Sequence, residues 1–291
     1  MQVILIHLHR VYYWRRNSSP FISGDVFSDL ATFNFNPPRF RNKNSKAKLL
    51  ENSEIIFVSG YDLEGFVKIC QRAKKIKVLI VGNSDRDYFN FPLDLFPDLK
   101  LVLLQNSFIS DNSLIATLPI GVENLRWGLN GKKKLLKFTP QVNRQNRILV
   151  GPFGNTHPSR GKVVEKLQIH EGPWDVFQGY VRPKDFQKLS SCYRYVACVR
   201  GNGVDSHRIW ECLYRGAIPI LLRDKWSESL LRYDLPILLT DSWEPNELSD
   251  LINSDFAKNL NFNPKEVEAL WTPYWIDYIK SKSRSSGSKV T

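Results

Sequence analysis

Short apolar runs alternate with helical patterns along most of this 291-residue chain. In the first half, residues 54–59, 77–81 and 99–104 read as short strands, and residues 63–75 carry a helical pattern between the first two. Parallel strands need a long crossover connection, so this alternation favours parallel sheets with helical crossovers and predicts an α/β fold. The further expected strands are 3–8, 115–119, 147–150, 195–199, 217–222 and 236–239, and the further helices are 159–167, 182–191, 205–215, 227–233, 244–253 and 264–280.

A change of composition divides the chain into two α/β halves. Glycines, three consecutive lysines and several Asn and Gln residues lie between 124 and 146 and indicate a domain junction. Two halves suggest a cleft, and α/β folds bind ligands in clefts at the carboxyl ends of strands. The aromatic face of the last helix fits packing on the first domain and packing on its own domain equally. The expected parts are a domain at 1–130, a domain at 147–262, a C-terminal helix at 263–281 and a disordered tail at 282–291.

Composition argues against general disorder and against a membrane-spanning helix. Hydrophobic residues make up 42% of the chain and aromatic residues 12%, which is enough for a sizeable core. No apolar run reaches the roughly 18 residues that a spanning helix needs, and the run at 3–8 is too short for a signal peptide. We expect a soluble, cytoplasmic protein. The four cysteines lack metal-site spacing and fit buried free thiols: Cys70, Cys192, Cys198 and Cys212.

The net charge of +12 allows three kinds of anionic partner. Nucleic acid, an anionic membrane surface and an anionic small substrate are all attracted to a basic protein. The charge gathers at 39–48, 72–77, 132–137 and after 280, where solvated surface is the ordinary reading. A nucleic-acid-binding protein needs exposed aromatics along a basic stripe, whereas most aromatics here fall inside apolar elements. We expect no nucleic-acid partner and leave peripheral membrane contact through the basic surface open.

The segment 200–220 carries the clearest chemistry. It reads as a strand end, a loop with Gly201 and Gly203, one amphipathic helix and a second strand. Glycines let a backbone approach a ligand, and the free N–H groups at a helix start favour an anion. Asp205 or Ser206 is expected to cap the helix.

One face of this helix carries charge. Arg208, Glu211 and Arg215 lie three and four residues apart and therefore share a face. Two arginines and a carboxylate beside a helix N-terminus would suit a nucleotide diphosphate and its ribose. The expected buried side is formed by Ile209, Cys212 and Leu213.

Two series of motifs carry a family resemblance. The first consists of Arg200-Gly201-Asn202-Gly203, Arg208-Ile209-Trp210-Glu211 and Gly216-Ala217-Ile218-Pro219. The second consists of Gly82-Asn83-Ser84-Asp85, Gln105-Asn106-Ser107 and residues 118–124 with Trp127. The first series resembles the donor domain of the exostosin-like glycosyltransferases, with Cys212 where that family usually has alanine, and the second is similar to one in their viral and bacterial members. Together they span roughly residues 77–222.

The resemblance implies a GT-B fold, in which two Rossmann-like domains face each other across a cleft. It implies transfer of a sugar from a nucleotide donor, most often a uridine diphosphate sugar, to a glycan or glycoconjugate acceptor, usually with inversion. The N-terminal domain would hold the acceptor and the C-terminal domain the donor. The sequence leaves open whether the sugar is a pentose, a hexose or a uronic acid.

The transfer builds negative charge on the leaving phosphate, so cations and N–H donors must be positioned there. Arg208 is the first candidate for this task and Arg200 the second, with no metal or other cofactor, and Glu211 would accept hydrogen bonds from the ribose hydroxyls. A glycine loop at 151–160 follows an expected strand and offers a second anion site. The other expected donor-binding residues are Asn155, Thr156, Arg160, Asn202, Gly203, Asp205, Ser206 and His207.

An inverting transfer also needs a base for the acceptor hydroxyl. Asp85 follows an expected strand in the acceptor half and is our candidate, and Asp62, His7 and His9 are its rivals. Asp85 and Asp87 also form the Asp-x-Asp pattern with which metal-dependent GT-A glycosyltransferases hold a divalent ion. A GT-A enzyme would, however, place its nucleotide in the first half. A non-catalytic sugar-nucleotide binder that lacks the base is a further alternative.

Overall fold

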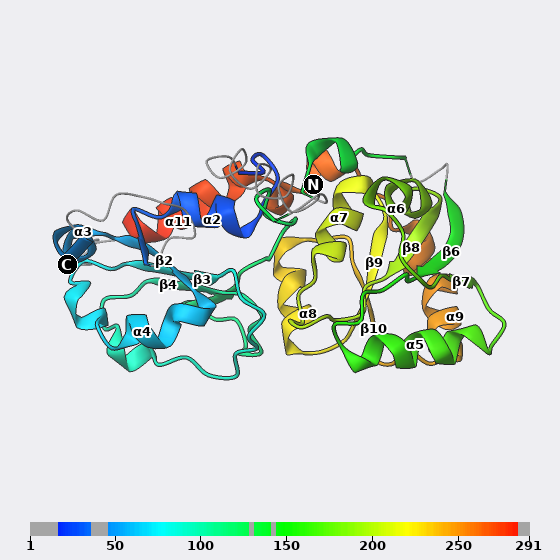
Figure 1. Ribbon diagram of the computed structural model, residues 1–291, viewed down its shortest axis with the longest axis horizontal. Coiled ribbons are helices and arrows are strands. Elements are labelled where there is room, and N and C mark those ends of the chain that lie inside the picture. The colour runs from blue at the N-terminus through cyan, green and yellow to red at the C-terminus, as the bar shows by residue number, and fades with distance from the viewer. Residues whose placement is uncertain (1–16, 36–45, 128–130, 141–143, 285–291) are drawn as a thin grey trace, which may run out of the picture.

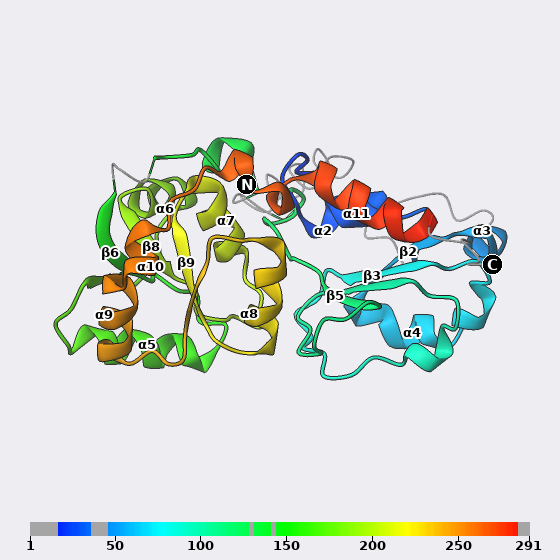
Figure 2. The same ribbon diagram turned by 180° about the vertical axis from the view of Figure 1, so that it is seen from behind.

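The computed structural model describes residues 17–35, 46–127, 131–140 and 144–284. Figures 1 and 2 show two α/β halves side by side along the long axis, each built around one parallel sheet of five strands. The predicted α/β class with parallel sheets is therefore confirmed. The strand expected at 3–8, with His7 and His9, lies outside the described residues. None of the helices within the described ranges is long and apolar enough to cross a membrane.

In the first half, β1 to β5 lie side by side in chain order, and every neighbouring pair is parallel. The middle strands are almost entirely apolar because helices cover both faces: α2 packs on β2 and β3, and α4 packs on β2 from the other side (Figure 1). The strands are β1 (Phe33–Phe35), β2 (Ile55–Ser59), β3 (Val78–Gly82), β4 (Leu101–Leu104) and β5 (Ile115–Thr117). The helices are α2 (Gly24–Leu30), α3 (Lys46–Asn52) and α4 (Leu63–Val67), with 3-10 turns at Gly60–Asp62, Cys70–Arg72 and Leu93–Leu95.

The second sheet is parallel and has the order β10-β9-β8-β6-β7, so the strand order reverses at β6, with β7 on one side and β8 on the other. Ligands of such sheets bind where the strand order reverses, at the carboxyl ends of the strands. The strands are β6 (Gln145–Val150), β7 (Trp174–Val176), β8 (Tyr193–Ala197), β9 (Ile218–Leu222) and β10 (Leu238–Thr240). The helices are α5 (Pro158–Gln168), α6 (Pro183–Ser190), α7 (His207–Arg215), α8 (Lys225–Ser229), α9 (Pro245–Asn253) and α10 (Asp255–Asn259), with 3-10 turns at Lys133–Leu135 and Leu230–Tyr233.

The C-terminal helix α11 (Thr272–Arg284) returns to the first half and lies beside α2 on its sheet (Figures 1 and 2). The ring of Trp275 meets that of Phe27 edge-on, with 5.2 Å between centroids. Tyr214 of α7 also joins the second half to the first, because its hydroxyl accepts a hydrogen bond from the Ile22 amide at 2.9 Å and donates one to the Leu270 carbonyl. One continuous apolar cluster therefore runs through both halves.

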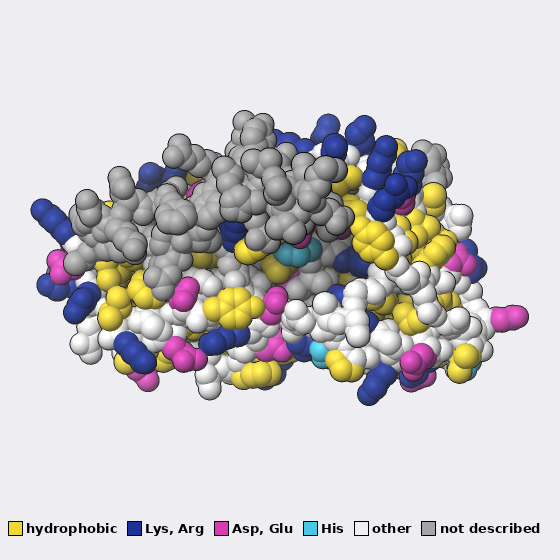
Figure 3. All heavy atoms as spheres, viewed as in Figure 1, with side chains coloured by type: hydrophobic (Ala, Val, Ile, Leu, Met, Phe, Trp, Pro, Cys, Tyr) yellow, Lys and Arg dark blue, Asp and Glu magenta, His cyan; other side chains and the backbone are white. Residues whose placement is uncertain are grey.

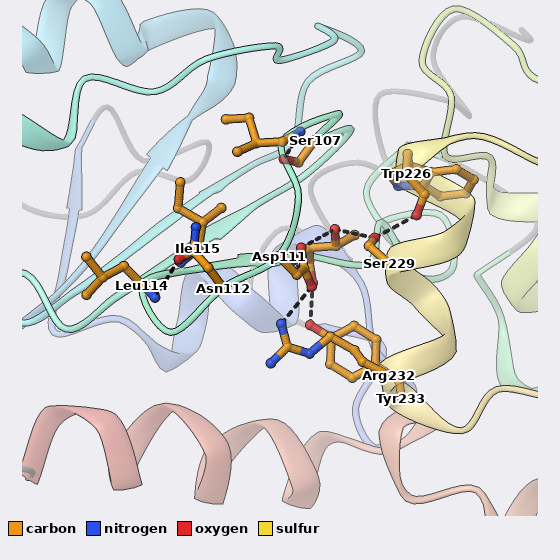
Figure 4. A network of polar contacts seen from close by, with 11 residues as sticks. Ser107, Asp111, Asn112, Leu114, Ile115, Trp226, Ser229, Arg232 and Tyr233 are labelled. Carbon is orange, nitrogen blue, oxygen red and sulfur yellow. Dashed lines mark hydrogen bonds and ion pairs between the residues drawn. The ribbon is translucent and has the colours of Figure 1, made fainter.

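Polar contacts at the carboxyl end of β5 also join the two halves (Figure 4). Thr117 and Ser229 share a hydrogen bond between their hydroxyls at 2.5 Å, and the Tyr233 hydroxyl donates to the Thr117 carbonyl at 2.6 Å. Arg232 pairs with Asp111 at 2.7 Å. These contacts join α8 and the turn after it to the first sheet, so the two halves are held together along a broad face.

Five elements were not expected from the sequence, and three boundaries lie far from their expected places. α2, β1 and α3 fall in a region without an assignable pattern, and the short elements β7 and α10 gave no signal. The helix expected at 63–75 ends at Val67, because Gly65 weakens it. The helix expected at 264–280 begins only at Thr272, because Trp271 is extended and pairs with Phe21 after two 3-10 turns (Pro264–Glu266 and Glu268–Leu270). It ends at Arg284, so the first residues of the expected tail, 282–284, are helical.

Candidate functional site

A cleft of about 570 Å³ opens at the carboxyl ends of β6 and β8, where the strand order of the second sheet reverses. Three segments of the second half form most of its wall: the loop after β6, the stretch from the loop after β7 into α6, and the stretch from the loop after β8 into α7. Asp85 and Ile120 close it from the first half. Separate segments of the second half therefore converge on one space, as expected for a ligand site of a doubly wound sheet.

The residues of α7 from Ile209 to Arg215 are buried, whereas His207 and Arg208 at its start are half-buried. Glu211 is 6% exposed and Arg215 1%. The guanidinium of Arg215 lies 5.7 Å from the Phe186 ring of α6 and donates to the Leu135 carbonyl at 2.8 Å, so this end of the charged face is packed against protein. The apolar and polar side chains of α7 lie on separate faces, as the sequence predicts, although both faces are largely buried. The helix begins at His207, and the side chain of Ser206, at the capping position, makes no capping bond. The predicted cap by Asp205 or Ser206 is wrong.

Asp205 instead clamps the two halves together. Its carboxylate accepts from the Ile120 amide at 2.7 Å and from the Trp210 indole at 2.8 Å, and its own amide donates to the Asn106 side chain at 3.0 Å. Burial raises the pKa of Asp205 to about 7, and the donors to its carboxylate oppose that rise. The carboxylate of Asp205 is therefore occupied by these contacts, although the residue lines the cleft.

Arg208 is the cation best placed to receive an anion. Its guanidinium lies between the rings of Phe153 and Phe186, 4.7 Å from each centroid, and one nitrogen donates to the Pro152 carbonyl at 2.6 Å. Its Nη1 is buried and has no hydrogen-bond partner among the described residues, and the same holds for the Ser206 hydroxyl. Burial lowers the pKa of Arg208. Two unpaired donors beside a helix N-terminus are what an oxyanion would satisfy.

Arg160 stands beside Arg208 but has a different task. It donates to the Arg200 carbonyl at 3.0 Å, to the Gly154 carbonyl at 3.2 Å and to the Thr156 hydroxyl at 2.8 Å, and so braces the two loops of the cleft. Burial, followed by the charge of Arg208, lowers the pKa of Arg160 to about 10. Two neighbouring arginines leave this wall strongly positive.

The glycines of the loop after β8 make room for protein side chains. A Cβ at Gly203 would lie 2.8 Å from the Asn106 amide, and one at Gly201 would lie 3.0 Å from the Arg160 guanidinium. We expected these glycines to let a ligand approach the backbone. The space that a Cβ would take is filled by residues of the first half and of α5. Both glycines also line the cleft, so a close approach of a ligand to their backbone stays a prediction.

The two carboxylates of the Asp-x-Asp pattern bind the opposite half rather than a common point. Asp87 pairs with Arg200 at 2.8 Å, and Asp85 accepts from the Asn202 amide at 3.4 Å. Within the described ranges, no group of three His, Cys, Asp or Glu side chains is arranged to hold a metal ion. Asp85 is exposed and lines the cleft, whereas Asp62 does not line it.

His207 also lines the cleft, and its proton position follows from its partner. Its Nδ1 lies 2.7 Å from the Gly121 carbonyl, which can only accept. Nδ1 must therefore carry the proton, and in the neutral ring Nε2 keeps its lone pair. Glu211 follows four residues later and also lines the cleft. Burial raises the pKa of Glu211, and Arg215, 3.4 Å away, opposes that rise.

Most of the expected site residues share this cleft. Arg200 and Asn155 are the two that do not line it. Sequence reasoning did not assign Phe153, Phe186 or Ile120 to the site. Phe153 lies in the glycine loop and Ile120 in the motif at 118–124, which could have indicated them, whereas Phe186 carries no such signal. The expected residues that line the cleft are Asp85, Thr156, Arg160, Asn202, Gly203, Asp205, Ser206, His207, Arg208 and Glu211.

Comparison with known proteins gives a weak structural likeness and no sequence match. No protein-family model and no curated protein matches the chain. Among solved structures, the chain is similar to CalG4, the calicheamicin glycosyltransferase, with 12% sequence identity and a TM-score of 0.38. The likeness covers 92% of this chain and 86% of that chain. A likeness of this size carries no functional argument, so the cleft itself has to indicate the function.

Proposed function

We propose that the protein is an inverting glycosyltransferase of the exostosin-like, GT-B type, which moves a sugar from a nucleotide diphosphate to a glycan hydroxyl. The observation that carries this proposal is the unpaired, buried Nη1 of Arg208 at the start of α7. It lies in a cleft of about 570 Å³, a size that suits a nucleotide sugar.

In this proposal the diphosphate lies against Arg208, the Ser206 hydroxyl and the first N–H groups of α7. These groups are already in position, so they stabilise the charge that grows on the leaving phosphate without reorganising. Glu211 receives the ribose hydroxyls, and Arg160 strengthens the positive field while it holds the loops. Arg200 and Asn155 do not line the cleft and have no direct contact with the donor in this proposal. The arginines replace a metal ion in this reading.

The base is Asp85, which reaches the cleft from the acceptor half and is exposed enough to meet an incoming hydroxyl. The Nε2 of His207 is the second candidate because its lone pair is free in the tautomer that Gly121 imposes. The donor we favour is a uridine diphosphate sugar, with a pentose, a hexose or a uronic acid as cargo.

A thermal-shift panel of uridine, guanosine and cytidine diphosphates and their sugars, with and without chelator, tests the proposal. A true ligand raises the melting temperature by mass action. Calorimetry should then show that Arg208→Ala weakens binding of the best diphosphate by roughly 10- to 100-fold, the loss expected for a charge-assisted hydrogen bond.

Arg147→Ala is the matched control, because Arg147 lies near the amino end of β6, paired with Asp175 and away from the cleft. Unchanged affinity in both Arg208→Ala and Glu211→Ala would remove the main support for the proposal. If chelator abolishes nucleotide binding, a metal ion holds the diphosphate, as in a GT-A enzyme, and the arginine site is wrong.

A further inference from the structure

A second hollow, of about 630 Å³, lies between the 3-10 turn at Lys133–Leu135 and α6. Buried Leu135 and half-buried Pro183 contribute to its lining. In Figure 3, dark blue side chains gather over the place that α6 occupies in Figure 1. Six cationic side chains line the hollow: Lys132, Lys134, Lys137, Arg182, Lys184 and Lys188.

The charge of this basic hollow is poorly balanced. Asp185 is the only acidic residue in its described lining, and it already pairs with Arg182 at 2.6 Å. Lys134, Lys184 and Lys188 are exposed, and the last two are one helical turn apart on α6. A hollow lined by one sign of charge focuses the field and attracts a polyanion.

The types of side chain indicate which polyanion. Five of the six cations are lysines, which act as hydrated point charges suited to a diffuse negative surface rather than as forks that read one group. Two exposed aromatic side chains lie next to this lining in the chain and form its aromatic border: Phe138, which directly follows Lys137 and is 42% exposed, and Tyr180, two residues before Arg182 and 84% exposed. Tyr180 also lines the cleft of Arg208. Lysines mixed with exposed aromatics are typical of a surface that rests on lipid headgroups.

We infer that the basic hollow and its aromatic border form a docking surface for an anionic lipid bilayer. The lysines meet the headgroup phosphates, while Tyr180 and Phe138 enter the interfacial layer. Pro183 lines both this hollow and the cleft of Arg208, so docking brings the mouth of that cleft to the lipid surface. On the proposed function, which this last step requires, the acceptor is then a glycan attached to the membrane.

The test is sedimentation of the full chain with vesicles of phosphatidylcholine alone and of phosphatidylcholine mixed with phosphatidylglycerol. We expect binding to the anionic vesicles only, and its decrease with added salt. Replacing Lys134, Lys184 and Lys188 together by Gln should lower vesicle affinity on the order of 100-fold, since each lysine near an anionic surface contributes roughly fivefold.

The matched control removes three exposed lysines of the first half, Lys68, Lys74 and Lys100, also by Gln. If both triple variants lose vesicle affinity equally, binding depends on net charge and not on the hollow, which overturns the proposal. Absence of vesicle binding, or tighter binding of a single-stranded oligonucleotide by the same three lysines, would overturn it too. Nucleotide affinity is measured in parallel: if no nucleotide binds but vesicle binding depends on the hollow, the proposed function fails and the docking surface stands.

Discussion

In the first half the described strands lie in chain order, whereas in the second half β7 lies on one side of β6 and β8 lies on the other. The reversal separates the loops that leave β6 and β8, and the cleft opens between them. The first half has no such reversal among its described strands. The loops at the carboxyl ends of its strands instead form hydrogen bonds to the second half, through Asp85 after β3, Asn106 after β4 and Ile120 after β5. One half thus forms the site, and the other closes it.

The largest expected effect concerns the base. If the first half supplies it, Asp85→Asn should lower turnover by about 10²- to 10⁴-fold, as expected for loss of a general base, and leave nucleotide affinity unchanged. His207→Gln is the companion variant. The turnover of both variants is measured as release of the nucleotide diphosphate from the donor that the thermal-shift panel identifies. If His207→Gln is inactive and Asp85→Asn is active, the base belongs to the second half, and the first half does not contribute the catalytic group.

The clamp between the halves is the next target. Asp205→Ala leaves the Ile120 amide and the Trp210 indole without an acceptor in a buried place, and we expect about 3 kcal/mol less free energy of unfolding. Urea unfolding followed by fluorescence measures this. Asp250→Ala, at an exposed position of α9, should change the same quantity by less than about 0.5 kcal/mol. Similar small changes in both variants would mean that the halves do not depend on this contact.

A pair of glycines gives the smallest effect and the sharpest contrast. In Gly203→Ala the new methyl meets the Asn106 amide, so the free energy of unfolding should fall by about 1–3 kcal/mol. In Gly161→Ala, where nothing lies within 4 Å of the new Cβ on helix α5, it should rise by about 0.5–1 kcal/mol. Unchanged stability in Gly203→Ala together with weaker nucleotide binding would mean that this glycine serves the ligand and not the contact with Asn106.

Local patterns were enough to predict most of the fold. The runs at 55–59, 78–82 and 101–104 are apolar at every or nearly every position because both faces of the sheet are covered, and such runs are visible in the sequence. Three-residue strands such as β1 and β7 hold too few positions for any period to appear. The extended Trp271 could not be foreseen, because its partner, Phe21, lies at the other end of the chain.

The site shows the same limit. The start of α7 and its neighbouring arginines follow from spacing within one segment, and Arg208 lies in the cleft as expected. The role of Asp205 depends on Ile120 and Asn106, which lie in loops of the other half. A capping residue and a clamp look alike in sequence, since both are an Asp just before a helix. Only the tertiary partners distinguish them.

The return of α11 has a consequence for how this protein is made. The second half is contiguous in the chain, whereas the first half is completed only when Thr272 bonds to Pro20 and Trp275 covers Phe27. The apolar face of the first half that α11 covers is therefore completed only after the second half has been synthesised, since α11 follows it in the chain.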